Sequence, residues 1–130
     1  MKPKILIISA KYYKHFSENL EFYASEVLNN KAKYKFISVP GIFEVPVVIS
    51  KYIKKYDAFI ALGCVIKGET PHFDFISMVT TEAIMKLSID YKKPIGNGII
   101  TCLNKEQALV RSKKKGQEAA KAVLSVLKDF

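Results

Sequence analysis

The sequence predicts an α/β protein: a single-domain, three-layer sandwich in which a four-stranded parallel sheet has helices on both faces. Short runs of β-branched and other apolar residues alternate with longer segments whose apolar residues recur at helical spacing. Residues 58–66 are almost wholly apolar, as in a strand that is buried on both faces. The 130 residues contain neither repeats nor low-complexity linkers, so we expect one domain over residues 1–130.

The first predicted unit is a strand followed by a helix. Residues 5–9 are mostly β-branched or aliphatic, which favours a strand. Apolar residues around and after Ser17, a candidate N-cap, then recur at spacings of three and four, which predicts a helix. They are Phe16, Leu20, Tyr23, Ala24, Val27 and Leu28.

The second predicted unit has the same order, and a third strand follows it. Residues 34–39 indicate a strand that ends at Pro40 and Gly41. Residues 43–54 predict a helix whose first turn contains Pro46, a position where a proline is tolerated. We expect the apolar run 58–66 to be the central strand of the sheet.

The third helix is expected to end at about Tyr91. After a turn at Gly68, Thr70 can cap this helix with Pro71 at its first position, so that His72 falls in the first turn. Its apolar residues surround more of the circumference than one buried stripe requires. We expect the excess face to pack against another subunit, and the exposed edges of a small sheet favour the same outcome.

The last predicted elements are a strand and two helices. Residues 95–101 form the strand, and Asn104 caps the helix at 105–112, with Gln107 three residues on as a variant of the capping box. We expect the lysine run at 113–115 to separate this helix from a final one over 117–128.

The charge of the chain is strongly positive, with 21 basic and 12 acidic residues and a net charge of +9. A nucleic-acid-binding module is therefore an alternative function. The lysines are spread over every segment, however, and no nucleic-acid-binding motif accompanies them, so we expect no nucleic acid as partner. Arg111 is the single arginine, which makes it a candidate for bidentate recognition of an anion. A surface arginine without a ligand is an equally good explanation.

The cysteines and the apolar runs indicate a cytoplasmic protein without a membrane partner. Cys64 and Cys102 lack CxxC spacing, which favours reduced thiols. The apolar run 5–8 is too short for a signal peptide, and no stretch approaches the ~18 residues of a membrane span. A zinc site built from the two cysteines and the two histidines would lack ligand spacing, so we expect no metal.

The candidate site lies where the predicted strands end, because open α/β sheets bind ligands at the carboxyl ends of their strands. Tyr12 and Phe43 offer aromatic surface there, Glu44 a carboxylate, and residues 68–70 a turn compatible with phosphate. A helix N-terminus disfavours imidazolium, which would keep His72 a neutral base near pH 7. Structural explanations stay open: core packing for the two aromatics, dipole complementation for Glu44, and a surface position for His72.

Four segments of the chain form a distinctive set: Val39–Pro46, Tyr56–Ala58, Leu62–Phe73 and Glu106–Arg111. In their order and at near-family spacing they resemble the lumazine synthase family, the 6,7-dimethyl-8-ribityllumazine synthases of riboflavin biosynthesis. The resemblance implies a flavodoxin-like fold of the lumazine synthase type and no cofactor.

The same resemblance implies a transferase of the penultimate step of riboflavin biosynthesis. It would condense 5-amino-6-ribitylaminouracil with 3,4-dihydroxy-2-butanone 4-phosphate to 6,7-dimethyl-8-ribityllumazine, with release of phosphate and water. A non-catalytic flavin- or lumazine-binding protein, or a shell-forming protein of the same fold, is the alternative.

The resemblance also implies roles for individual residues. Tyr12 would lie against the pyrimidine ring, and His72 would move protons. The ribityl chain would be held by Ile42, Phe43 and Glu44, and the pyrimidinedione by Cys64, Val65 and Ile66, largely through backbone atoms. The phosphate would be bound by Glu69, Thr70 and Arg111.

The family shares each pocket between neighbouring subunits of a pentamer, which implies that Asn97, Arg111 and Lys115 come from the adjacent chain. Asn97 stands where the family usually has an aromatic residue, so a hydrogen bond would replace ring stacking there. The lysine contact falls on Lys113, Lys114 or Lys115. Pentamer, decamer and sixty-subunit shell all stay open, and riboflavin synthase is a further candidate partner.

Overall fold

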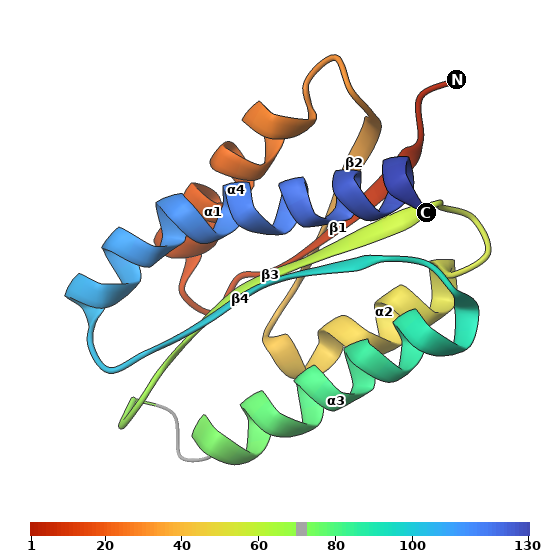
Figure 1. Cartoon of the computed structure of the whole chain (residues 1–130). Helices are drawn as coiled ribbons and strands as arrows, with labels where there is room; N and C mark the ends of the chain where they lie inside the picture. The colour runs from red at the N-terminus through yellow and green to blue at the C-terminus, as the bar shows by residue number, and fades with distance from the viewer. Residues whose placement is uncertain (70–72) are drawn as a thin grey trace.

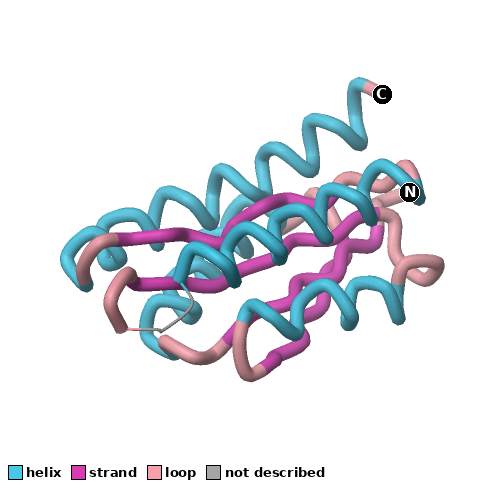
Figure 2. Tube along the Cα trace, turned by 90° about the horizontal axis from the view of Figure 1, so that it is seen from below, coloured by secondary structure: helices cyan, strands magenta, loops and turns pink. Residues whose placement is uncertain are grey.

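A parallel four-stranded sheet separates two layers of helices in the computed structural model, which describes residues 1–69 and 73–130 (Figure 1). The strands lie in the order β2-β1-β3-β4. Figure 2 shows the same layers from below. In chain order the elements are β1 (Lys4–Ala10), α1 (Lys14–Leu28), β2 (Lys33–Val39), the 3₁₀ turn η1 (Ile42–Glu44), α2 (Val45–Tyr52), β3 (Ala58–Ile66), α3 (Phe73–Tyr91), β4 (Ile95–Cys102) and α4 (Lys105–Asp129). The predicted fold class is confirmed.

Strand β3 is one of the two inner strands of the sheet, beside β1, as its composition predicted. All nine of its residues are buried, because helices cover both of its faces. Helices α1 and α4 pack on one face around Leu20, Ile60 and Val123, and α2 and α3 pack on the other around Ile49 and Phe59 (Figure 1).

The start of α1 differs from the prediction. The helix begins at Lys14, so Ser17 lies inside it and is not its N-cap. Ser17 is fully buried, and its hydroxyl donates a hydrogen bond to the carbonyl oxygen of Ala10 at the end of β1. Ser17, which the sequence suggested as a helix cap, instead donates to a carbonyl group at the end of β1.

The predicted helix over 43–54 is divided and shorter. It starts as η1, where the Gly41 N–H donates to Glu44 Oε1 (2.9 Å), and continues as α2 with Pro46 in its first turn. Helix α2 ends at Tyr52, because the backbone after it closes into i→i−3 bonds such as Lys55 N–H to Tyr52 O (2.9 Å).

The prediction of two C-terminal helices is wrong, since α4 is one continuous helix through the lysine run. Lysine is a good helix former, and the charges of Lys113 and Lys114 lie exposed. Gly116 does not break the helix either. It lies where α4 crosses α1, and a Cβ atom there would come within 2.5 Å of the Leu20 carbonyl oxygen. The glycine is a contact residue between two helices.

We expect the substitution Gly116→Val to lower the free energy of unfolding by about 3 kcal/mol, because α4 would have to move away from the α1 backbone. Urea denaturation followed by circular dichroism measures this change. The control is Lys114→Ala, a substitution at an exposed position of the same helix. Its free energy of unfolding should stay within about 0.5 kcal/mol of that of the parent protein. Equal stability of the two variants would contradict the close packing of α1 on α4.

The part of the chain that the structure describes contains no helix both long and apolar enough to cross a membrane.

Candidate functional site

The segments that follow β1, β2 and β3 meet at the carboxyl end of the sheet. Gly63 lies at their centre: a Cβ atom there would come within 2.7 Å of Ile42 Cγ2 and 3.1 Å of Ala10 Cβ. A glycine at this position therefore lets η1 and the end of β1 approach β3 directly. The strand-end geometry that the sequence predicted is present.

The side chains of Cys64–Ile66 are buried. Their exposed fractions are 5%, 4% and 1%, so a ligand can meet this segment only through its backbone. Pairing of β3 with β1 ends at Ser9↔Leu62, whereas pairing with β4 continues to Ile66↔Cys102. Within the described residues, no strand pairs with the β1 side of Cys64–Ile66, which leaves backbone donors and acceptors there for a ligand.

The two cysteines are buried thiols. Burial raises the pKa of the Cys64 thiol to about 12, and its neighbour Cys102 contributes in the same direction. Burial also raises the pKa of Cys102, while Arg111 opposes that shift. Both groups are thus protonated near neutral pH, and this site does not offer a thiolate nucleophile.

Two large aromatic side chains belong to the loops after β1 and β2 that meet this segment. Tyr12 and Phe43 are 64% and 62% exposed, so the interpretation of them as core residues is wrong. Phe43 belongs to η1, whose neighbouring Ile42 is buried and anchors the turn. Exposed aromatic faces beside free backbone groups suit a flat polar ring, which can stack on the aromatics and form hydrogen bonds to the backbone.

Glu44 lies partly buried beside these aromatics. Its Oε1 accepts the Gly41 N–H, as described above, which fixes the carboxylate. The second oxygen of the carboxylate takes part in no hydrogen bond within the described residues. It is therefore available to accept from a ligand hydroxyl.

A turn of exposed residues leads from β3 toward α3. Gly68 adopts a left-handed conformation (φ 83°), and the Glu69 N–H donates to the Ile66 carbonyl oxygen (3.3 Å). The Glu69 carboxylate accepts a hydrogen bond from the Tyr13 hydroxyl (2.9 Å). Thr70 and His72, predicted for phosphate binding and proton transfer, lie outside the described residues.

The remaining predicted residues gather on β4 and α4, apart from this group. Arg111 Nη1 donates to the Thr101 carbonyl oxygen (2.8 Å), and Arg111, Lys114 and Lys115 line a hollow of about 490 Å³ with residues 99–101 of β4. Among the described residues of the loops after β1, β2 and β3, none lines this hollow. Within one chain the structure therefore presents two separate groups of predicted site residues.

Asn97 belongs to the second group, because it lies exposed on the edge strand β4. Its side-chain Oδ1 accepts the Ile99 N–H (3.1 Å), which orients the amide. The NH₂ group of the same side chain is then the part left to meet a ligand.

Tyr13 is a site residue that sequence reasoning missed. Besides its bond to Glu69, its ring lies edge-on to Tyr12, with 4.9 Å between ring centroids. Burial, followed by the hydrogen bond to Glu69, raises the pKa of the Tyr13 hydroxyl, so this group remains a donor at neutral pH. The sequence feature that could have indicated its role is its position directly after Tyr12, in a loop at the end of a strand.

An ion pair ties the same loop to α1. Lys11 binds the Glu21 carboxylate, and the Ser9 hydroxyl donates to the same Glu21 oxygen (2.7 Å). The loop that carries Tyr12 is thus held from two sides, by Glu21 of α1 and by Glu69 of the turn after β3.

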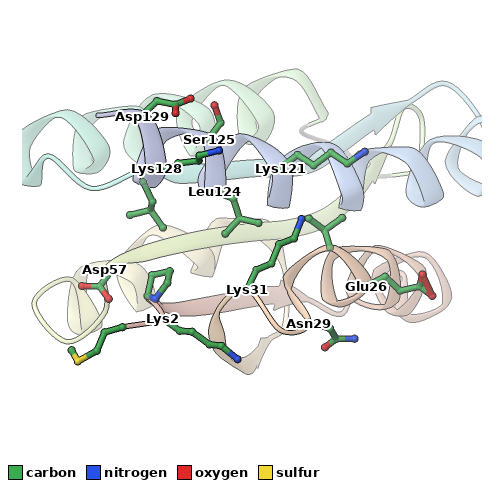
Figure 3. Close-up of a pocket in the computed structure, with 14 residues that line it drawn as sticks. Lys2, Glu26, Asn29, Lys31, Asp57, Lys121, Leu124, Ser125, Lys128 and Asp129 are labelled. Atoms are coloured by element: carbon green, nitrogen blue, oxygen red, sulfur yellow. The ribbon is translucent and has the colours of Figure 1, made fainter.

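Another hollow lies at the opposite end of the sheet. It measures about 980 Å³ and is lined by the start of the chain and by the ends of α1 and α4 (Figure 3). Its lining carries both signs of charge, with the lysines Lys2, Lys31, Lys121 and Lys128 and the acidic residues Glu26, Asp57 and Asp129. Because it lies where the strands begin, it is separate from the strand-end site.

Comparison with known proteins gives a consistent result along the whole chain. The family model described as 6,7-dimethyl-8-ribityllumazine synthase matches residues 2–129. The 6,7-dimethyl-8-ribityllumazine synthase 1 of Rhodopseudomonas palustris is 40% identical, over 96% of this chain and 84% of its own length. The 6,7-dimethyl-8-ribityllumazine synthases of Agrobacterium fabrum and Sphingopyxis alaskensis are 40% and 41% identical, over 97% and 95% of this chain and 93% and 92% of theirs.

Proposed function

Because the chain belongs to the 6,7-dimethyl-8-ribityllumazine synthase family, we propose that its two groups of site residues carry that family's reaction. The protein is a transferase of riboflavin biosynthesis. It condenses 5-amino-6-ribitylaminouracil with 3,4-dihydroxy-2-butanone 4-phosphate and releases phosphate and water. The non-catalytic alternative is not favoured, since the full-length relatives are named as synthases.

One observation carries the assignment of the pyrimidine substrate: exposed aromatics lie beside an unpaired strand backbone. In our proposal the pyrimidine ring stacks on Tyr12 and bonds the backbone of Cys64–Ile66, whose side chains are buried. The ribityl hydroxyls extend along η1, where Phe43 packs on the chain and Glu44 accepts a hydrogen bond. Geometry of this kind suits positional catalysis, because it holds the reacting amine in a fixed place.

We assign the phosphorylated substrate to the turn after β3. Backbone N–H groups at the start of a helix favour an anion, which agrees with a phosphate near Glu69 and Thr70 before α3. Arg111 completes the phosphate site as its guanidinium partner. In one chain, however, Arg111 binds Thr101 and lines a different hollow from the strand-end loops.

We therefore propose that each active site is shared between two copies of the chain. One subunit supplies the strand-end loops, and its neighbour supplies Arg111, Asn97 and a lysine from the 490 Å³ hollow. Lys114 and Lys115 line this hollow, which supports the choice of one of these two as the lysine. The Asn97 NH₂ group would donate to the pyrimidine ring in place of the family's aromatic stacking.

The condensation requires proton transfer at several steps. The amine attacks the ketone, and water leaves to give an imine. Phosphate is then eliminated to leave an enol that becomes a carbonyl, and the ribitylamino nitrogen attacks this carbonyl and expels a second water as the ring closes. One imidazole that accepts and returns protons serves all of these steps, and we assign this role to His72. The site's thiols stay protonated and take no covalent part.

Helix α3 carries the surface that we assign to assembly. Four of its apolar side chains are 58% to 66% exposed and recur at spacings of three, seven and four, which places them on one side of the helix. They are Phe75, Met78, Met85 and Ile89. A stripe of this kind suits helix-on-helix packing between copies of the chain, as in a pentamer with shared sites.

The variant Met85→Lys is expected to dissociate the assembly, because a charge in the middle of the stripe would have to be buried without a partner. Sedimentation velocity should then show a smaller species than for the parent protein. Phe22→Lys is the control: Phe22 is an exposed aromatic of α1, in the opposite helix layer, and its replacement should leave the assembly intact. Unchanged sedimentation of Met85→Lys would remove this stripe from the interface.

The reaction itself is tested by mixing the purified protein with the two substrates. Lumazine absorbance and released phosphate should rise together and in equal amounts. Folded protein that produces neither signal would overturn the enzymatic function. We place this reaction in the cytoplasm, as the cysteine usage of the chain suggests.

A further inference from the structure

Tyr13 contacts the two parts of the strand-end group that follow β1 and β3. Its hydroxyl donates to Glu69 Oε2, and its ring lies edge-on to Tyr12. The same ring packs against the buried cluster that contains Cys64 and Ile66. A single half-buried side chain thus connects the aromatic, backbone and turn segments of the site.

The sheet separates the Glu69 carboxylate from α3. The cluster under Tyr13 includes Phe16 of α1 and Ala108 of α4, so Tyr13 lies on the α1/α4 side of the sheet. The first residue of α3, Phe73, packs on the opposite side, against the cluster that contains Val65. By binding Tyr13, the exposed Glu69 carboxylate is directed toward the α1 side.

This placement matters because a carboxylate in a phosphate-binding turn repels the ligand. Two unit charges 4 Å apart interact by about 4 kcal/mol at the dielectric typical of a protein surface. The Tyr13 hydroxyl is a neutral donor whose raised pKa keeps it protonated, so it can hold the carboxylate without adding charge. Freed from this bond, the Glu69 side chain could rotate toward the phosphate.

We propose that Tyr13 is a positioning residue for the phosphorylated substrate: its hydroxyl holds the negative charge of Glu69 on the α1 side of the sheet, away from the phosphate. This inference rests on the proposed function and adds a role for Tyr13 that acts through Glu69. Loss of the hydroxyl should weaken binding of the butanone phosphate but not of the pyrimidine, because the packing of the ring stays in place.

The test is Tyr13→Phe, assayed with each substrate varied in turn. We expect the KM for the butanone phosphate to rise about fivefold, because the freed Glu69 carboxylate would repel the phosphate through a partly screened surface interaction. The KM for the pyrimidine and kcat should stay within about twofold, since the aromatic ring is retained. Because exposed charges are screened, the rise in KM should shrink as ionic strength increases.

A double-mutant cycle with Glu69→Gln identifies the cause. Without the carboxylate charge, Tyr13→Phe should change the KM for the butanone phosphate less than it does in the parent protein. The control is Tyr23→Phe, also on the α1 side, whose hydroxyl has no hydrogen-bond partner within the described residues.

Three results would overturn the inference: an unchanged KM in Tyr13→Phe, an equal rise in both KM values, or the same rise in the Glu69→Gln background. An equal rise would indicate a merely structural role. If the parent protein itself formed no lumazine, the proposed function would fail first and the inference with it. That outcome is distinct from an active parent whose kinetics Tyr13→Phe does not change.

Discussion

Replacement of His72 by alanine is expected to lower kcat by about 10² to 10⁴-fold, the range that a positioned general acid–base contributes. The condensation needs protons moved at imine formation, phosphate elimination and ring closure, and no other imidazole is available nearby in the sequence after β3. Binding of both substrates should persist in the variant, because Tyr12, Glu44 and the β3 backbone would be untouched. Stopped-flow absorbance of lumazine formation at saturating substrate measures the effect.

The chain offers a matched control for this experiment in its other histidine. His15 lies exposed on α1, with its ring centroid 5.6 Å from that of Phe16. His15→Ala removes the same chemical group from another part of the chain, and turnover should equal that of the parent. If both variants turned over like the parent, His72 would have no part in the mechanism.

The fold was predictable because its strongest signals are local. The apolar run of β3 can be satisfied only between two helix layers, and the observed strand has the predicted bounds, Ala58–Ile66. The errors arose where a tertiary contact overrode a local cue. Ser17 looked like a cap but bonds Ala10. The lysine run at 113–115 looked like a break between two helices, but α4 continues through it and packs Gly116 against Leu20.

The site was predictable only in part, for a related reason. Residues that follow the strands, such as Tyr12 and Phe43, are exposed as a strand-end site requires. The link between Tyr13 and Glu69 spans 56 positions of the sequence and depends on which side chains the folded sheet brings together. No spacing rule contains that information, so the coupling of the first loop to the third emerges only in three dimensions.

The shared site gives the second large effect, which involves Arg111. Arg111→Ala should raise the KM for the butanone phosphate by about 10²-fold, since charge-assisted and bidentate bonds to a phosphate are lost. The pyrimidine KM should change far less, because the ring contacts come from the other group of residues. Arg111→Lys should restore only part of the loss, since an ammonium cannot form the planar fork. Steady-state kinetics with each substrate varied would check this selectivity.

Co-expression of Arg111→Ala chains with His72→Ala chains then decides whether the site is shared. Each variant alone should be nearly inactive at low butanone phosphate. In random assemblies of equal amounts, about a quarter of the interfaces join an intact His72 to an intact Arg111 from the neighbouring subunit. In a closed ring every chain has a neighbour that completes its site, so activity should recover to about a quarter of the parent level. A site built within one chain predicts no recovery at all. A second mixture, of parent chains with chains that carry both substitutions, distinguishes the two cases again. A shared site predicts about a quarter of the parent activity, whereas a site within one chain predicts about half.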